Sequence, residues 1–185
     1  LSQIQESFNN TDDYLSNIPS LIQPNLALYI PMNNSDVNMY SDKLILAPQL
    51  ASSDFTIEFW AKIYTTTSYR EIYSQGDTDV ANNYLTINYT SNDTIFLNFN
   101  GDGVEWNISS YLNNFNHYAF TYDKSETTNA NITKLYINGT FIHAYQYWGD
   151  IKDGTNASGF VRIGRNSNSS GSIGPFYLNG KLKQL

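Results

Sequence analysis

Nine asparagines stand in the pattern Asn-x-Ser/Thr without a middle proline, which makes each a permitted acceptor for an N-linked glycan. With 24 Asn, 19 Ser and 15 Thr in 185 residues, chance predicts about four such sites. The excess indicates covalent N-glycans and passage through a eukaryotic secretory pathway, although a β-surface rich in Asn and Thr also produces the pattern freely. The nine acceptors are Asn9, Asn33, Asn88, Asn92, Asn107, Asn131, Asn138, Asn156 and Asn168.

Catalytic chemistry needs reactive groups at defined spacings, and the sequence supplies few of them. A glycosidase uses two carboxylates on either side of a sugar bond. None of the five glutamates has an acidic neighbour two residues away, on the same face of a strand. The motifs of serine hydrolases, P-loop enzymes and zinc proteases are absent, and the histidines are only His117 and His143. The sequence therefore predicts a protein that is not an enzyme.

A calcium site is a weaker possibility. Asn98, Asn100, Asp102 and Gly103 imitate the first half of an EF-hand loop, but Ser109 stands where the loop requires glutamate. A tight turn between two strands explains the same residues. Other pairs of aspartates in loops are also consistent with a bound Ca²⁺, but the sequence does not identify which of them would be its ligands. The candidate ligands are Asp77, Asp79, Asp102, Asp150 and Asp153.

Exposed aromatic side chains are a third source of chemistry, because their flat faces cover the apolar side of a sugar ring. Three of them, Tyr145, Tyr147 and Trp148, precede a loop at 149–158. Trp60 lies on the opposite face of its strand from the apolar residues. The alternative is that these rings pack under a loop or against another segment. The candidate ligand-binding residues are Trp60, His143, Tyr145, Tyr147 and Trp148.

The composition suits a single domain outside the cell. The net charge of −7 argues against nucleic acid as a partner, and no apolar run is long enough for membrane insertion. Charged residues make up 15% of the chain, below the usual quarter, and hydroxyl and amide side chains take their place. Cysteine is absent, which excludes disulfides, thiol catalysis and cysteine zinc sites. We therefore expect an extracellular location, either secreted or at the cell surface.

Two kinds of periodicity divide the chain. Residues 1–24 have apolar positions at helical spacing and end near two prolines, which predicts an N-terminal arm or linker. From residue 25 onward, short runs with a period of two alternate with clusters of Asn, Asp, Gly and Ser. Such runs are typical of antiparallel strands with one buried face. An all-β domain over 25–185 is expected.

One hairpin is predicted in detail, around the turn dipeptide Asn138-Gly139 between strands at 132–137 and 140–147. A two-residue turn sets Leu135 opposite Ile142 on the core face. The other face then carries Lys134, Tyr136, Phe141, His143 and Tyr145. That aromatic face is expected either to be covered by another layer or to bind something.

Five segments follow one another along the chain: Phe55–Lys62, His117–Asp123, Lys134–Thr140, Val161–Arg165 and Leu178–Leu182. Their order and spacing resemble the laminin-G-like, concanavalin A-like family of secreted and surface proteins. The resemblance implies a two-sheet antiparallel jelly-roll sandwich with six or seven strands per sheet and adjacent first and last strands. The family pattern would continue beyond residue 185, so we expect either a longer protein or another segment that completes the edge.

Three functions follow from these observations. The first is a non-catalytic extracellular glycoprotein module that recognises or adheres to a glycan or an extracellular protein. The second is a glycan-coated structural subunit that self-assembles into an oligomer or filament, through residues 1–24 or an open edge strand. The third, more remote, is a diverged glycoside hydrolase.

Overall fold

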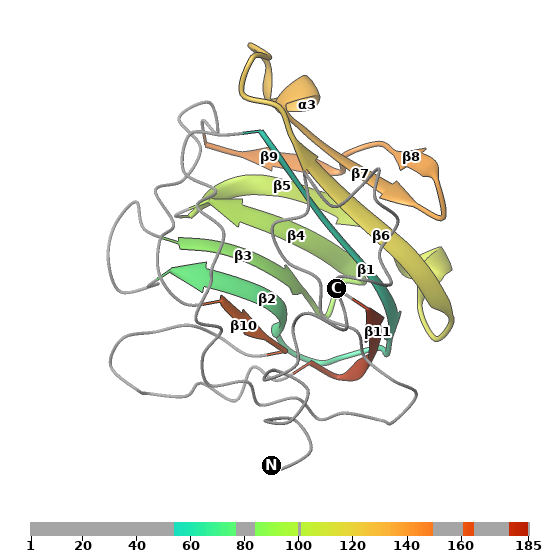
Figure 1. Cartoon of the computed structure of the whole chain (residues 1–185). Helices are drawn as coiled ribbons and strands as arrows, with labels where there is room; N and C mark the ends of the chain where they lie inside the picture. The colour runs from blue at the N-terminus through green and yellow to red at the C-terminus, as the bar shows by residue number, and fades with distance from the viewer. Residues whose placement is uncertain (1–53, 77–83, 100, 150–160, 165–177, 185) are drawn as a thin grey trace, which may run out of the picture.

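The computed structural model describes residues 54–76, 84–99, 101–149, 161–164 and 178–184 (Figure 1). Within these residues, eleven strands form two antiparallel sheets, beside one 3-10 turn and one short α-helix. This arrangement confirms the predicted all-β, two-sheet sandwich. The predicted arm at 1–24 lies outside the described residues, so its role in assembly stays a prediction.

The first sheet has five described strands in the order β11-β1-β6-β7-β8. The first and last described strands of the chain, β1 and β11, pair with each other. The strand bounds are β1 (Phe55–Ile63), β6 (Phe115–Tyr122), β7 (Thr133–Ile137), β8 (Thr140–Ile142) and β11 (Gly180–Gln184). The helix α3 (Asn129–Ile132) connects β6 to β7.

The second sheet has six described strands in the order β10-β2-β3-β4-β5-β9, which Figure 1 shows as a curved layer behind β1 and β6. The 3-10 turn η2 (Ser109–Tyr111) leads from β5 to β6 in the other sheet. The strand bounds are β2 (Arg70–Gly76), β3 (Tyr84–Tyr89), β4 (Thr94–Phe99), β5 (Asp102–Asn107), β9 (Gln146–Trp148) and β10 (Val161–Ile163).

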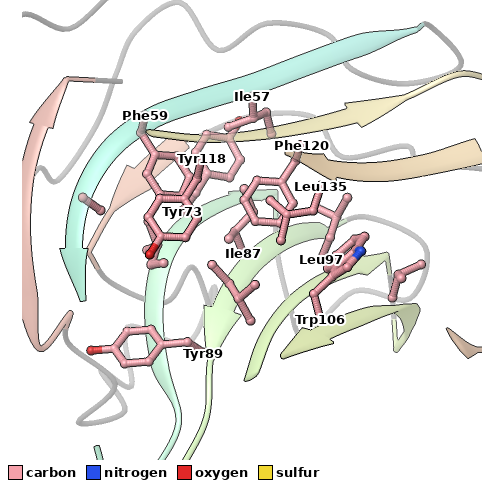
Figure 2. Close-up of a cluster of buried hydrophobic side chains, with 14 of the residues drawn as sticks. Ile57, Phe59, Tyr73, Ile87, Tyr89, Leu97, Trp106, Tyr118, Phe120 and Leu135 are labelled. Atoms are coloured by element: carbon pink, nitrogen blue, oxygen red, sulfur yellow. The ribbon is translucent and has the colours of Figure 1, made fainter. Parts of the chain in front are cut away.

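Side chains from both sheets meet in one aromatic and aliphatic core (Figure 2). Phe59 of β1 stacks on Tyr118 of β6 with ring centroids 5.5 Å apart, and Trp106 of β5 meets Phe120 of β6 edge-on at 5.7 Å. Each fully buried large apolar side chain contributes about 1.5–3 kcal/mol. Apolar residues thus recur at every second position because these positions face the core between the two sheets.

The structure confirms the register of the predicted hairpin but shortens its second strand. Leu135 pairs with Ile142, and Asn138 and Gly139 both have the positive φ of a type I′ turn. The prediction of one strand over 140–147 is wrong, because β8 ends at Ile142 and β9 belongs to the other sheet. The Tyr145 amide donates to the Glu105 carbonyl at 2.7 Å, which fixes the point of transfer.

Candidate functional site

The outer face of the six-stranded sheet carries a row of five side chains, four of them polar, that crosses five strands. Ile87, Leu97, Val104 and Trp106 point into the core, so their strand neighbours point outward. Strand register aligns these neighbours side by side across β2, β3, β4, β5 and β9. We call them the outer row: Glu71, Asn88, Phe96, Glu105 and Gln146.

The end of the outer row at β2 and β3 is buried and incompletely hydrogen-bonded. Glu71 is 7% exposed and Asn88 is 5% exposed. Glu71 Oε2 and Asn88 Oδ1 have no hydrogen-bond partner among the described residues. Burial raises the pKa of the Glu71 carboxyl to about 8, so this group is protonated at neutral pH. The β2–β3 end is therefore polar but largely uncharged.

The other end of the row is open to solvent at β5 and β9. Trp148, which is 45% exposed, donates from Nε1 to Glu105 Oε2 at 3.4 Å. The second carboxylate oxygen of Glu105 accepts a hydrogen bond from Thr94 Oγ1, and Thr94 Oγ1 is 2.8 Å from Thr90 Oγ1. The half-exposed Trp148 ring thus lies beside the Glu105 carboxylate, whose other oxygen is held by Thr94. We call Trp148 and Glu105 the candidate site.

The end of β9 is fixed by a close contact at Gly149. Gly149 has φ of +61°, and a Cβ there would lie 1.8 Å from the Asp102 carboxylate. Its carbonyl accepts a hydrogen bond from Asn129 Nδ2 of α3 at 2.9 Å. Only glycine combines this backbone angle with such close packing. Gly149 therefore helps to position Trp148, the residue before it.

The predicted binding residues Trp60 and His143 lie elsewhere, on the outer side of the five-stranded sheet. Trp60 of β1 lies over His117 of β6 with ring centroids 5.4 Å apart, and His117 Nε2 is 3.4 Å from Glu58 Oε2. The His143 ring meets Phe141 edge-on at 4.8 Å. Only part of the aromatic face predicted for the hairpin is on its paired strands, where Tyr136 lies opposite Phe141 with ring centroids 5.7 Å apart and Phe141 is exposed. Tyr145, which was predicted on the same face, lies beyond the end of β8.

The other two predicted tyrosines also stay outside the candidate site. Tyr145, 69% exposed, is in the connection between β8 and β9, and Tyr147 pairs with Val104 and so points to the core side of β9. Of the five predicted residues, only Trp148 is in the candidate site. Sequence reasoning missed Glu105, whose only signal was its position between the apolar residues Val104 and Trp106.

Asp102, a candidate calcium ligand, lies next to a tight turn, as the alternative interpretation predicted. Phe99 pairs with Asp102 around this turn, and Asn98 Oδ1 accepts a hydrogen bond from the Gly101 amide at 2.8 Å. Within the described ranges, no three His, Cys, Asp or Glu side chains gather closely enough to hold a metal ion. Calcium binding stays a prediction, because the other four candidates, Asp77, Asp79, Asp150 and Asp153, lie outside the described residues.

The structure corrects one of the predicted glycan acceptors. Asn88 was expected to present a glycan to solvent because it alternates away from apolar neighbours, but the outer face of β3 is itself buried. That expectation is wrong for Asn88. Asn92, Asn107, Asn131 and Asn138 are exposed. The remaining acceptors, Asn9, Asn33, Asn156 and Asn168, lie outside the described residues.

The described part of the chain contains no helix with the length and apolar character needed to cross a membrane. The described residues form a two-layer antiparallel β-sandwich of the jelly-roll class, with the mostly polar outer row on the larger described sheet. The chain belongs to the concanavalin A-like lectin/glucanases superfamily, whose family model matches residues 36–185. This match confirms the family suggested by the sequence. A comparison with curated protein sequences finds no match.

Several solved structures share this fold at low sequence identity. The CBM40 module of the Ruminococcus gnavus IT-sialidase is 17% identical with a TM-score of 0.54, covering 72% of this chain and 74% of that one. The same module bound to α2,3-sialyllactose is 14% identical with a TM-score of 0.52, covering 70% of this chain and 71% of that one. A mutant NanB sialidase from Streptococcus pneumoniae is 15% identical with a TM-score of 0.52, covering 73% of this chain and 22% of that one. These likenesses show the fold alone.

Proposed function

We propose that this chain is a non-catalytic glycan-recognition module, with Trp148 and Glu105 at the centre of its binding site. The half-exposed indole beside a held carboxylate is the observation that carries the proposal. A flat ring covers the apolar face of a sugar, and a carboxylate accepts hydrogen bonds from its hydroxyls. The sialyllactose-bound CBM40 module supports the proposal, because it shows a similar fold with a bound glycan.

The proposed ligand is a neutral oligosaccharide rich in hydroxyl groups. The charged group at the centre of the candidate site is the Glu105 carboxylate, and the whole chain carries a net charge of −7. An anionic sugar such as sialic acid would be repelled by both. In this respect the proposed ligand differs from the sialyllactose bound by the similar CBM40 module.

The spacing of carboxylates supports binding over hydrolysis. Glu71 and Glu105 belong to the same outer row but lie on β2 and β5, three strand intervals apart. Strands in a sheet are about 4.8 Å apart, which gives about 14 Å between the two residues. Glycosidases need their two carboxyl groups about 5–9.5 Å apart. This pair is too far apart to act on the two sides of one sugar bond.

We place the module outside the cell, secreted or at the surface, where it would serve in glycan recognition or adhesion. The supporting observations are the excess of Asn-x-Ser/Thr sites and the exposure of four of the five acceptors that the structure describes. A surface that carries few charges is also consistent with attached sugars that keep it soluble.

A glycan array tests the binding proposal. The full chain, produced in bacteria so that it carries no N-glycans of its own, is applied to neutral and sialylated oligosaccharides. We expect neutral structures to be retained and sialylated versions of the same structures to bind at least tenfold more weakly. Retention of sialylated structures alone would contradict the proposed ligand class, and retention of none would contradict the proposed function.

A further inference from the structure

We propose that Asn92, Asn107 and Asn131 carry N-linked glycans in the folded protein, whereas Asn88 and Asn138 carry none. The inference rests on the secretory route in the proposed function, and not on the Trp148–Glu105 site. All five residues stand in equivalent sequence patterns. What separates them is the surroundings of the side-chain nitrogen, Nδ2, to which the glycan attaches.

Asn88 has no space for a sugar. It lies on β3, where it pairs with Glu71 of β2 on one side and Phe96 of β4 on the other. The side chain is 5% exposed, and its Nδ2 donates to Thr86 Oγ1 at 3.3 Å. A sugar on this nitrogen would have to displace the neighbours that bury it. A chain modified at Asn88 therefore cannot form the described sheet.

Asn138 is at an exposed turn, but both ends of its side-chain amide are in use. Oδ1 accepts from the His117 amide at 2.9 Å, and Nδ2 donates to Asn116 Oδ1 at 2.8 Å. Asn116 is itself buried and donates to the Tyr111 carbonyl at 2.6 Å. The attachment nitrogen thus points into a network that joins the turn to β6 and η2. A sugar on this nitrogen would crowd Asn116, the buried residue whose side-chain oxygen lies only 2.8 Å away.

The other three acceptors leave the attachment nitrogen available. Asn92 is exposed in the turn between β3 and β4, where its backbone amide donates to Thr90 Oγ1 at 3.2 Å. Asn131 is exposed in α3. Asn107 is exposed at the end of β5, and its Oδ1 accepts from the Ser109 amide and hydroxyl at 3.1 and 2.7 Å. Those bonds use the oxygen and not the nitrogen.

The three proposed sites lie at two ends of the sheet. Asn92 and Asn107 are neighbours, because the residues that follow them, Asp93 and Ile108, are joined by a backbone hydrogen bond of 2.8 Å. Asn131 belongs to α3, which is bonded to Gly149 beside the start of β5. Since β5 is six residues long, the two ends are about 17 Å apart. Two glycans are thus expected at one end and one at the other.

The test is glycopeptide mapping of the full chain after secretion from a eukaryotic cell, with enzymatic glycan release in ¹⁸O-water to mark occupied asparagines. We expect the mark at Asn92, Asn107 and Asn131, and none at Asn88 or Asn138. Material retained in the cell is mapped in parallel and divided by protease resistance. A glycan at Asn88 is expected only in the protease-sensitive fraction.

Two matched variants remove a pattern without changing the asparagine. Ser109→Ala should lower the intact mass by one glycan, because it removes the Asn107 site. Thr140→Val should leave the number of attached glycans unchanged in the intact mass, since Asn138 is not modified. Occupied Asn88 or Asn138 in protease-resistant material, or unmodified Asn92, Asn107 and Asn131, would overturn the inference. Because the glycan array uses bacterial protein, failure here is distinct from failure of the proposed function.

Discussion

The Trp148 indole nitrogen lies 3.4 Å from Glu105 Oε2, although the two residues are 43 positions apart in the sequence. Antiparallel pairing of β9 with β5 places Gln146 opposite Glu105 and Trp148 opposite Gly103. The pairing partner Gly103 has no side chain, so the Trp148 ring can reach diagonally to the carboxylate. The bond is long for an N–H···O contact, and a sugar hydroxyl can replace the indole as donor to Glu105.

Trp148→Ala is expected to weaken binding of the neutral glycans retained on the array by about tenfold or more. The reason is loss of the ring face that would cover the sugar. The unfolding temperature should change little, because Trp148 is 45% exposed and is outside the buried core. Isothermal titration calorimetry and thermal melts measure the two effects.

Tyr145→Ala is the matched control, because Tyr145 is a 69% exposed aromatic residue three positions away and outside the candidate site. Its affinity should equal that of the wild type. Equal loss in both variants, or no loss in Trp148→Ala, would remove Trp148 from the binding site.

Glu71 should make the protein less stable as the pH rises from about 4.5 to about 8. In this window the unfolded chain has lost the proton while the folded chain keeps it, so each pH unit lowers the free energy of unfolding. Glu71→Gln should abolish this loss and be more stable than the wild type at pH 8, by an amount on the order of a few kcal/mol at most. Urea denaturation at several pH values gives the slope.

Glu126→Gln serves as the control for the Glu71 variant, because Glu126 lies in the connection between β6 and α3, outside the outer row. This control variant should keep the wild-type dependence of stability on pH between about pH 5 and about pH 8. If Glu71→Gln keeps that dependence as well, the carboxyl is charged in the folded protein and the assigned protonation state is incorrect.

Asn138→Gly should destabilise the protein by about 1–2 kcal/mol. Glycine accepts the φ of 51° at this turn, so the loss isolates the two side-chain hydrogen bonds to His117 and Asn116. Asn138→Ala should be worse, because it adds strain from positive φ. The free energy of unfolding in urea ranks the two variants, and equal stability of Asn138→Gly and wild type would show that the amide network contributes nothing.

Gly149→Ala should both destabilise the protein and weaken glycan binding, because the new Cβ would overlap the Asp102 carboxylate and shift the end of β9. Gly139→Ala is the comparison, since Gly139 has φ of +78° and open space around it. It should cost only about 1–2 kcal/mol of backbone strain and leave binding intact. Wild-type affinity in Gly149→Ala would mean that this contact does not position Trp148.

The sequence alone identified the all-β class, the family and one complete hairpin register. The alternation around Leu135 and Ile137 and the turn dipeptide Asn138-Gly139 are local signals, and the structure confirms the pairing that they predict. Periodicity assigns a side chain to one face of a strand, because successive residues point in opposite directions. It does not say what covers that face.

Only the tertiary structure decided which polar residues are accessible and which distant residues meet. Asn88 and Asn107 both alternate away from core residues, yet the first is buried beside Glu71 and the second is exposed at the end of β5. Likewise, the transfer of the chain from β8 to β9 separated His143 from Trp148 and brought Trp148 to Glu105. Burial and long-range pairing depend on how the two sheets pack and connect, and neither is encoded in local spacing.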